Sequence, residues 1–236
     1  MLAKLNKIFV YGDSLMRGVV LGRDQKYTQL DNNCVCEVSR SIRIEIENKS
    51  IFGMTVPKAL TRFFSGKNDE AFRKNAVLLE YGGNDCNFNW KAISKDPHGV
   101  HLPATDPIVF EKNLIDMTTS IKKSGGSPVL MTLPPIHSER FLDWICRDGL
   151  SRENILLWLG DVEQIYRWQE KYNRAIERVA YNTRTPLLDV RGAFLNIRNY
   201  ADCLCEDGMH LNEQGHRMMA HFLIGCANRY RYRFEE

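Results

Sequence analysis

Short apolar runs alternate along the chain with longer segments in which apolar residues recur at helical spacing. The runs that read as strands cover residues 8–11, 42–46, 77–81, 129–133 and 187–190. The helical patterns cover residues 55–64, 107–124, 161–181 and 212–230. This alternation is typical of βαβ units, in which a parallel sheet is covered by helices on both faces. We therefore expect an α/β protein with a doubly wound sheet of about five strands.

The last helical pattern is the best defined of the four. Asn212 is a good N-cap, and apolar residues follow at helical spacing, namely Ala220, Leu223, Ile224 and Ala227. We expect His216 and His221 at exposed or partly buried positions of this helix.

Two segments interrupt the alternation. Residues 86–106 contain Trp90, His98 and His101, and residues 136–160 contain Trp144 and Trp158. Both follow predicted strands, so both should lie at the carboxyl edge of the sheet, where open α/β folds bind ligands. They are candidate walls of a substrate pocket, with Trp90, His137 and Trp144 as candidate contacts. Ordinary surface insertions are the alternative, and for any one tryptophan core packing is an equally good interpretation.

Length and charge narrow the class of protein. A chain of 236 residues, 44% of them hydrophobic, supports one substantial core, so we expect a single domain over residues 1–236 with insertions at about 86–106 and 136–160. The 32 basic and 29 acidic residues are spread along the sequence and leave a net charge of +3. No charged block marks a nucleic-acid or membrane partner.

The cysteines and the start of the sequence bear on location and metal binding. The sequence shows no secretion signal and no bilayer-length apolar run, and its seven cysteines are an odd number. We expect a cytoplasmic protein, although a processed secreted form would look the same. Structural zinc sites usually separate paired cysteines by about two to four residues. The Cys34/Cys36 and Cys203/Cys205 pairs, which we place in loops after strands, are therefore more simply buried or unpaired thiols. Basic and aromatic residues alternate at 229–234, as they do in some single-strand nucleic-acid binders. Arginines at a helix C-terminus also favour the helix dipole, and we adopt this second interpretation.

Four short segments follow predicted strands and carry the candidate chemistry. They are Gly12-Asp13-Ser14-Leu15, Gly53, Gly82-Gly83-Asn84-Asp85 and, after a loop, Asp207-Gly208-Met209-His210. A serine hydroxyl is a poor nucleophile unless a base lies within hydrogen-bond reach and an acidic group orients that base. Gly53 allows the backbone to point an N–H into the site, and the carboxamide of Asn84 can donate to an oxyanion. Taken alone, Ser14 would be read as a helix cap and His210 as a surface histidine.

These four segments, in this order, resemble the SGNH hydrolases, also called the GDSL esterase/lipase family, over almost the whole chain. The resemblance implies a flavodoxin-like three-layer α/β/α sandwich with strand order 2-1-3-4-5. It implies Ser14 as nucleophile, His210 as general base and Asp207 as the carboxylate that orients it. The oxyanion hole would combine the N–H groups of Ser14 and Gly53 with the side chain of Asn84. No metal or organic cofactor is implied.

Two further carboxylates lie beside these residues. We interpret Asp13 and Asp85 as structural groups that accept local backbone N–H bonds in tight turns.

The resulting expectation is a serine ester hydrolase that works through an acyl-serine intermediate. Small acyl esters such as acetylated carbohydrates are the favoured substrates, because the loop at 84–90 is rich in asparagine and the insertions carry aromatic residues. Lipase, lysophospholipase or thioesterase activity is the alternative within the family. A non-catalytic binding module on the same fold is the alternative from another class. The sequence makes no prediction of oligomeric state.

Overall fold

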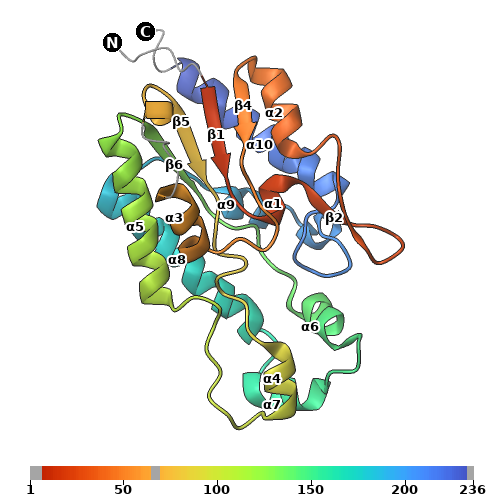
Figure 1. The fold of residues 1–236 in the computed structure, drawn as a ribbon. Helices are drawn as coiled ribbons and strands as arrows, with labels where there is room; N and C mark the ends of the chain where they lie inside the picture. The colour runs from red at the N-terminus through yellow and green to blue at the C-terminus, as the bar shows by residue number, and fades with distance from the viewer. Residues whose placement is uncertain (1–6, 65–69, 233–236) are drawn as a thin grey trace.

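A computed structural model describes residues 7–64 and 70–232 of the chain. Its centre is a parallel sheet of five strands (Figure 1), namely β1 (Lys7–Tyr11), β4 (Glu45–Asn48), β5 (Ala76–Leu79), β6 (Ser127–Met131) and β7 (Leu187–Leu188). The spatial order is β4-β1-β5-β6-β7. Numbered along the chain within this sheet, that order is 2-1-3-4-5, so the predicted fold class is confirmed.

Helices cover both faces of the sheet. One face carries α3 (Val56–Phe64), α5 (Pro107–Lys123) and α8 (Gln164–Thr183), and the other carries α2 (Cys34–Ile42), α9 (Val190–Leu195) and α10 (Glu213–Tyr232). Successive strand residues serve opposite faces, as the pleat requires: Phe9 packs in the first apolar layer and Val10 in the second. The sheet is therefore buried on both sides, which explains the continuous apolar runs in the sequence.

Helix α2 was not predicted. Because it extends to Ile42, the second strand of the sheet begins at Glu45 rather than at residue 42. The Asn33 side chain caps α2 by accepting hydrogen bonds from the N–H groups of Val35 and Cys36. The helix ends at Ile42 and Arg43 is left-handed, with φ 55°, so the alternation of isoleucines from residue 42 is not one strand. Cys34 lies in this helix and is buried, in contrast to the predicted loop.

Helix α10 begins as predicted. Asn212 accepts a hydrogen bond at 3.0 Å from the N–H of Gly215. His221 is exposed, but His216 is fully buried, so the expectation of an exposed or partly buried His216 was wrong. Burial lowers the pKa of His216 to about 4.

Several smaller elements surround the ends of the strands. They are α1 (Ser14–Arg17), the antiparallel hairpin β2 (Val19–Leu21) and β3 (Tyr27–Gln29), η1 (Glu70–Phe72), α4 (Trp90–Lys95), α6 (Ser138–Cys146), α7 (Arg152–Leu159) and η2 (Tyr200–Cys203). In Figure 1, α4, α6 and α7 lie beyond the carboxyl ends of the strands.

The two sequence insertions pack against each other there. Ile93 from α4, Leu142 from α6 and Ile155 from α7 belong to a third apolar cluster, separate from the two layers that flank the sheet. The Ser94 hydroxyl accepts a hydrogen bond at 2.7 Å from the N–H of Ser151, which joins the insertions directly. We call residues 86–106 and 136–160 together the insertion cluster. No helix in the described part of the chain is long and apolar enough to cross a membrane.

Candidate active site

Ser14, His210 and Asp207 form a continuous hydrogen-bonded chain at the carboxyl edge of the sheet. The Ser14 Oγ to His210 Nε2 distance is 2.9 Å, and the His210 Nδ1 to Asp207 Oδ2 distance is 2.6 Å. All three residues are buried, and Asp207 is fully so. Residues 196 positions apart in the sequence therefore meet with the geometry that lets an imidazole accept a serine proton.

The serine is held by the start of α1, directly after β1. Asp13 caps this short helix by accepting a hydrogen bond at 2.9 Å from the Leu15 N–H. This local bond is the structural role expected of Asp13, and it places Ser14 at the first helical position.

The histidine is held by the turn over residues 207–210. Asp207 Oδ1 accepts hydrogen bonds from the N–H groups of Met209 and His210, both at 3.0 Å. Gly208 has φ +70°, and a Cβ there would lie 2.7 Å from the carbonyl oxygen of His137. The Gly208 carbonyl in turn accepts a bond from the His137 N–H at 2.8 Å. Only glycine fits this close approach, so the turn rests directly on the start of α6.

The charge of Asp207 is stabilised by its neighbours. Burial would raise its pKa, but the hydrogen bond and charge of His210 and the two backbone N–H donors outweigh burial and hold the pKa below its ordinary value. Asp207 therefore remains ionised and can stabilise an imidazolium at His210.

Tyr27 is a site residue that the sequence analysis missed. Its hydroxyl donates to Asp207 Oδ2 at 3.1 Å, and its ring lies 4.9 Å from the His210 ring. Burial and the Asp207 charge raise the Tyr27 pKa well above its ordinary value, so the hydroxyl stays a donor. Tyr27 reaches the site because the β2–β3 hairpin folds back after α1. The chain around Gly22 and Asp24 carries a turn signal, but nothing in it points to Asp207.

The three donors expected for the oxyanion hole follow β1, β4 and β5. In the described part of the chain the N–H groups of Ser14 and Gly53 have no hydrogen-bond partner. Gly53 has φ +69°, and a Cβ at this position would meet no atom within 4 Å. Its neighbour Phe52 lines the cavity beside Ser14, but Gly53 itself is not among the lining residues described. The Asn84 Nδ2 donates to Asp13 Oδ2 at 2.8 Å, which fixes the amide and leaves its second N–H free.

Beneath this edge, Asp13 lies against a buried glutamate. The Asp13 N–H donates to Glu80 Oε2 at 3.3 Å, and both side chains are buried. Burial, followed by the charge of Asp13, raises the Glu80 pKa well above its ordinary value, which favours the neutral acid.

Asp85 is structural too, but its partners are not those of a local turn. Its Oδ1 accepts bonds from the Val56 N–H at 2.9 Å and the Thr105 hydroxyl at 2.7 Å. Burial raises its pKa to about 6. The tight-turn interpretation was wrong because the Asp85 carboxylate bonds to the start of α3 and to Thr105, both distant in the sequence.

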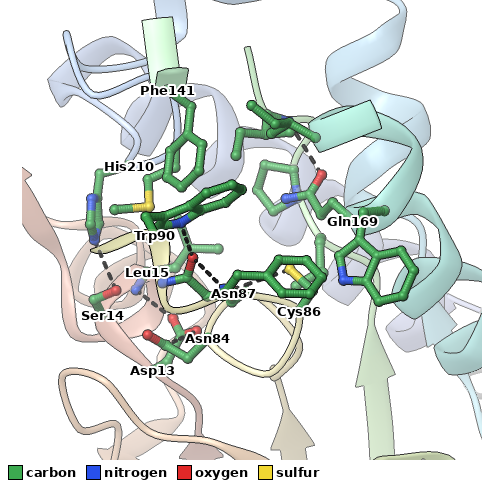
Figure 2. Close-up of a pocket in the computed structure, with 18 of the residues that line it drawn as sticks. Asp13, Ser14, Leu15, Asn84, Cys86, Asn87, Trp90, Phe141, Gln169 and His210 are labelled. Carbon is green, nitrogen blue, oxygen red and sulfur yellow. Dashed lines mark hydrogen bonds between the residues drawn. The ribbon is translucent and has the colours of Figure 1, made fainter. Parts of the chain in front are cut away.

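A cavity of about 440 Å³ opens beside Ser14 and His210 (Figure 2). Its walls come from the ends of the strands, from α8 and from both parts of the insertion cluster, which contribute Phe88, Trp90, Phe141 and Trp158. Trp90 thus lies where the sequence analysis expected it.

His137 and Trp144 are not among the described residues that line the cavity. The His137 ring accepts the Arg140 N–H at the start of α6. Trp144 is buried beside Tyr27 and stacks under Arg147. No group of three or more His, Cys, Asp and Glu side chains within the described ranges is arranged to hold a metal ion.

The fold is similar to that of several solved hydrolases. An acetylxylan esterase from Geobacillus stearothermophilus is 17% identical, with 95% of each chain covered and a TM-score of 0.66. A lipase/acylhydrolase from Enterococcus faecalis is 18% identical over 94% of each chain, with a TM-score of 0.63. The esterase EstA from a Pseudoalteromonas species, in a structure inhibited by monoethylphosphonate, is 17% identical over 96% of this chain and 99% of its own, with a TM-score of 0.61. No curated protein matches this chain by sequence.

The fold and the residues gathered at its edge define the class as a carboxylic ester hydrolase. The chain belongs to the GDSL-like lipase/acylhydrolase family, whose model matches residues 10–218.

Proposed function

We propose that the protein is a serine ester hydrolase in which Ser14 is the nucleophile, His210 the general base and Asp207 the group that orients His210. The observation that carries this assignment is the unbroken hydrogen-bond chain through the three side chains at the mouth of a cavity.

The reaction follows from the geometry in two half-steps. Ser14 Oγ attacks the ester carbonyl carbon while its proton passes to His210 Nε2, and the carbonyl oxygen becomes an oxyanion facing the Ser14 and Gly53 N–H groups and the Asn84 amide. The C–O bond to the alcohol then breaks, and the imidazolium protonates the departing oxygen. Water next gives a proton to His210 and attacks the acyl-serine. The acid is released as Ser14 recovers its proton.

Small acyl esters, with acetylated carbohydrates foremost, are the proposed substrates. The cavity supports this choice because aromatic side chains can stack on sugar rings and the asparagine-rich loop at 84–90 brings amides to its edge. Longer acyl chains are the competing candidates, because much of the wall is apolar.

We also infer one domain, because residues from Asp13 near the start of the chain to His210 near its end, together with both insertions, line a single cavity. The cytoplasmic location stays a prediction.

The test compares p-nitrophenyl esters of increasing chain length and a panel of acetylated sugars, using the wild type and Ser14→Ala. Activity concentrated on acetyl esters and lost in Ser14→Ala supports the proposal. Ser41→Ala, at an exposed serine of α2, is the matched control and should keep full activity. A preference for long chains would move the assignment to lipids. Undiminished activity in Ser14→Ala would refute the serine mechanism.

A further inference from the structure

The side-chain amide of Gln169 is fixed in one orientation at the cavity wall. Gln169 lies on α8, is only 8% exposed, and lines the cavity. Its Oε1 accepts hydrogen bonds from the Ile136 N–H at 3.3 Å and from Arg191 Nη1 at 3.0 Å. Both partners are donors only, so an amide turned the other way would set N–H groups against N–H groups. The oxygen must therefore face the protein.

The other end of the amide has nothing to bind within the described residues. No hydrogen bond is made by the Gln169 Nε2 group, although the residue is more than nine-tenths buried. The Nε2 atom is not among the fully buried, unpartnered side-chain atoms of the described residues, so it is open to the cavity. A ligand that displaces water there without accepting this hydrogen bond would leave the donor unpaired, at a cost of about 1–3 kcal/mol.

A buried arginine holds the amide in place from behind. Arg191 is 4% exposed, forms a 2.6 Å ion pair with Glu170 and has its guanidinium over the Tyr166 ring. Arg191 is not among the cavity-lining residues described, and it contacts the cavity wall from behind, through Gln169 and the carbonyl oxygen of Leu133. This arrangement pre-organises the donor, which lowers the cost of ligand binding.

A second amide shows the same orientation logic at the insertion cluster. Asn87 Oδ1 accepts the Trp90 indole N–H at 2.7 Å and the Phe88 N–H at 3.0 Å, so its Nδ2 group is also the free end. Figure 2 shows Asn87 between Asn84 and Gln169, with Ser14 and His210 on the opposite side of the view from Gln169. The two amides therefore add polar groups to the part of the cavity that extends away from Ser14.

Aromatic side chains surround these donors. Phe88 lies edge-on to Trp158 at 4.9 Å and tilted against Trp168 at 5.2 Å, and all three rings line the cavity. An alkyl chain in this part of the cavity would satisfy the rings but leave the Gln169 donor unpaired. A saturated ring that carries oxygen would satisfy both, because its C–H face packs on the aromatic rings and its oxygen accepts the amide proton.

We propose that Gln169, with Asn87, forms a donor-only subsite that binds an ether or hydroxyl oxygen of an uncharged ring in the substrate. The subsite rests on the proposed ester hydrolysis and gives it a specificity determinant: Gln169 favours oxygenated esters over hydrocarbon esters of the same shape.

The test uses acetyl esters that differ by one atom. Cyclohexyl acetate is compared with tetrahydropyran-3-yl acetate and tetrahydropyran-4-yl acetate, which place the ether oxygen at different ring positions. In Gln169→Glu the carboxylate still accepts from Ile136 and Arg191, but the donor is gone. Gln169→Leu removes the whole amide. Gln29→Glu, at an exposed glutamine of β3, is the matched control.

The expected result is a wild-type kcat/KM ratio that favours at least one ether ester by about tenfold. This ratio should collapse toward unity in Gln169→Glu and stay at the wild-type value in the control Gln29→Glu. An unchanged kcat/KM ratio in folded Gln169→Glu overturns the subsite. A wild type that shows no preference for either ether ester over cyclohexyl acetate overturns it as well.

A binding arm separates failure of the subsite from failure of the proposed function. Titration calorimetry of monoacetylated glucose into Ser14→Ala, with and without Gln169→Glu, reads the subsite without turnover. Binding weakened about tenfold by Gln169→Glu supports the subsite even where no ester is hydrolysed, an outcome that would refute the hydrolase alone. Equal affinity of the two proteins, or no binding to either, refutes the subsite even where p-nitrophenyl acetate is cleaved.

Discussion

The two ends of the cavity are built differently. At one end, the side chains of Ser14, His210 and Asp207 are already bonded to one another, and Tyr27 and the turn at 207–210 supply further partners. At the other end, Gln169 keeps an unpaired donor among aromatic rings. The catalytic side chains at the first end find their partners within the chain, whereas the Gln169 donor at the second end is partnered only by a ligand. Reactivity should therefore be sensitive to any change among the bonded groups, and selectivity to changes at the open donor.

The largest effect in this comparison is expected from Asp207→Asn. The variant loses the negative charge that stabilises an imidazolium at His210 and fixes its tautomer, so kcat should fall by roughly 10⁴-fold. Steady-state kinetics on p-nitrophenyl acetate measures the change. Thermal unfolding is the control, because Asp207 also accepts the N–H groups of Met209 and His210. Full activity in a folded variant would show that another group orients the base.

A smaller loss is expected from Asn84→Ala. Removing one oxyanion donor typically lowers kcat by about 10²–10³-fold, and Asn84 is the only side chain proposed for that role. Asn196→Ala, at an exposed asparagine after α9, should leave kcat unchanged. An unchanged kcat in Asn84→Ala would show that the two backbone N–H groups suffice and that Asn84 has no role in the mechanism.

Tyr27→Phe sharpens the comparison by removing one bond and keeping the ring. Loss of the hydroxyl donor to Asp207 should lower kcat by about three- to tenfold, because the carboxylate keeps its other three partners. The pH profile of kcat should also shift, since Tyr27 acts through Asp207 and His210. Tyr181→Phe, at an 85% exposed tyrosine, is the control. An unmoved pH profile would reduce Tyr27 to a packing role.

A different kind of effect, on stability rather than rate, is expected at Glu80. The Glu80 pKa is raised above its ordinary value of 4.5, so the folded state binds a proton that the unfolded state releases. That contribution is present below the ordinary pKa and is lost as the pH rises through the folded-state value. Glu80→Gln is neutral at every pH and lacks this pH dependence. In that window, the free energy of unfolding of the wild type should therefore fall relative to that of the variant by up to about 1.4 kcal/mol per pH unit. Denaturant unfolding across pH measures this, and parallel curves would contradict the buried neutral acid.

The sequence predicted the sheet and the segments around Ser14 and His210 because both depend on short-range patterns. Buried strands need continuous apolar runs, and the turn at 207–210 is specified within four residues. The exception among the strands has a local cause: Ile42, Ile44 and Ile46 alternate like a strand, yet Ile42 completes the buried face of α2.

The long-range contacts around the cavity could not be predicted in the same way. Gln169 acquires its role from Arg191, 22 positions away, and from Ile136, 33 positions away. Trp144 looked like a pocket residue, but it packs beside Tyr27 from a hairpin near the start of the chain. Such roles depend on which distant elements meet, and residue type alone does not carry that information.

The bond between His137 and Gly208 has a consequence for how this protein can change. The start of α6 and the turn that holds His210 share backbone contacts at a glycine with no room for a side chain. A substitution that shifts α6 and so reshapes the cavity would therefore also displace His210, the proposed general base. Substitutions at this contact should therefore change substrate range and catalytic rate together. A related protein that evolved a different substrate range here would also need compensating changes that restore the position of His210.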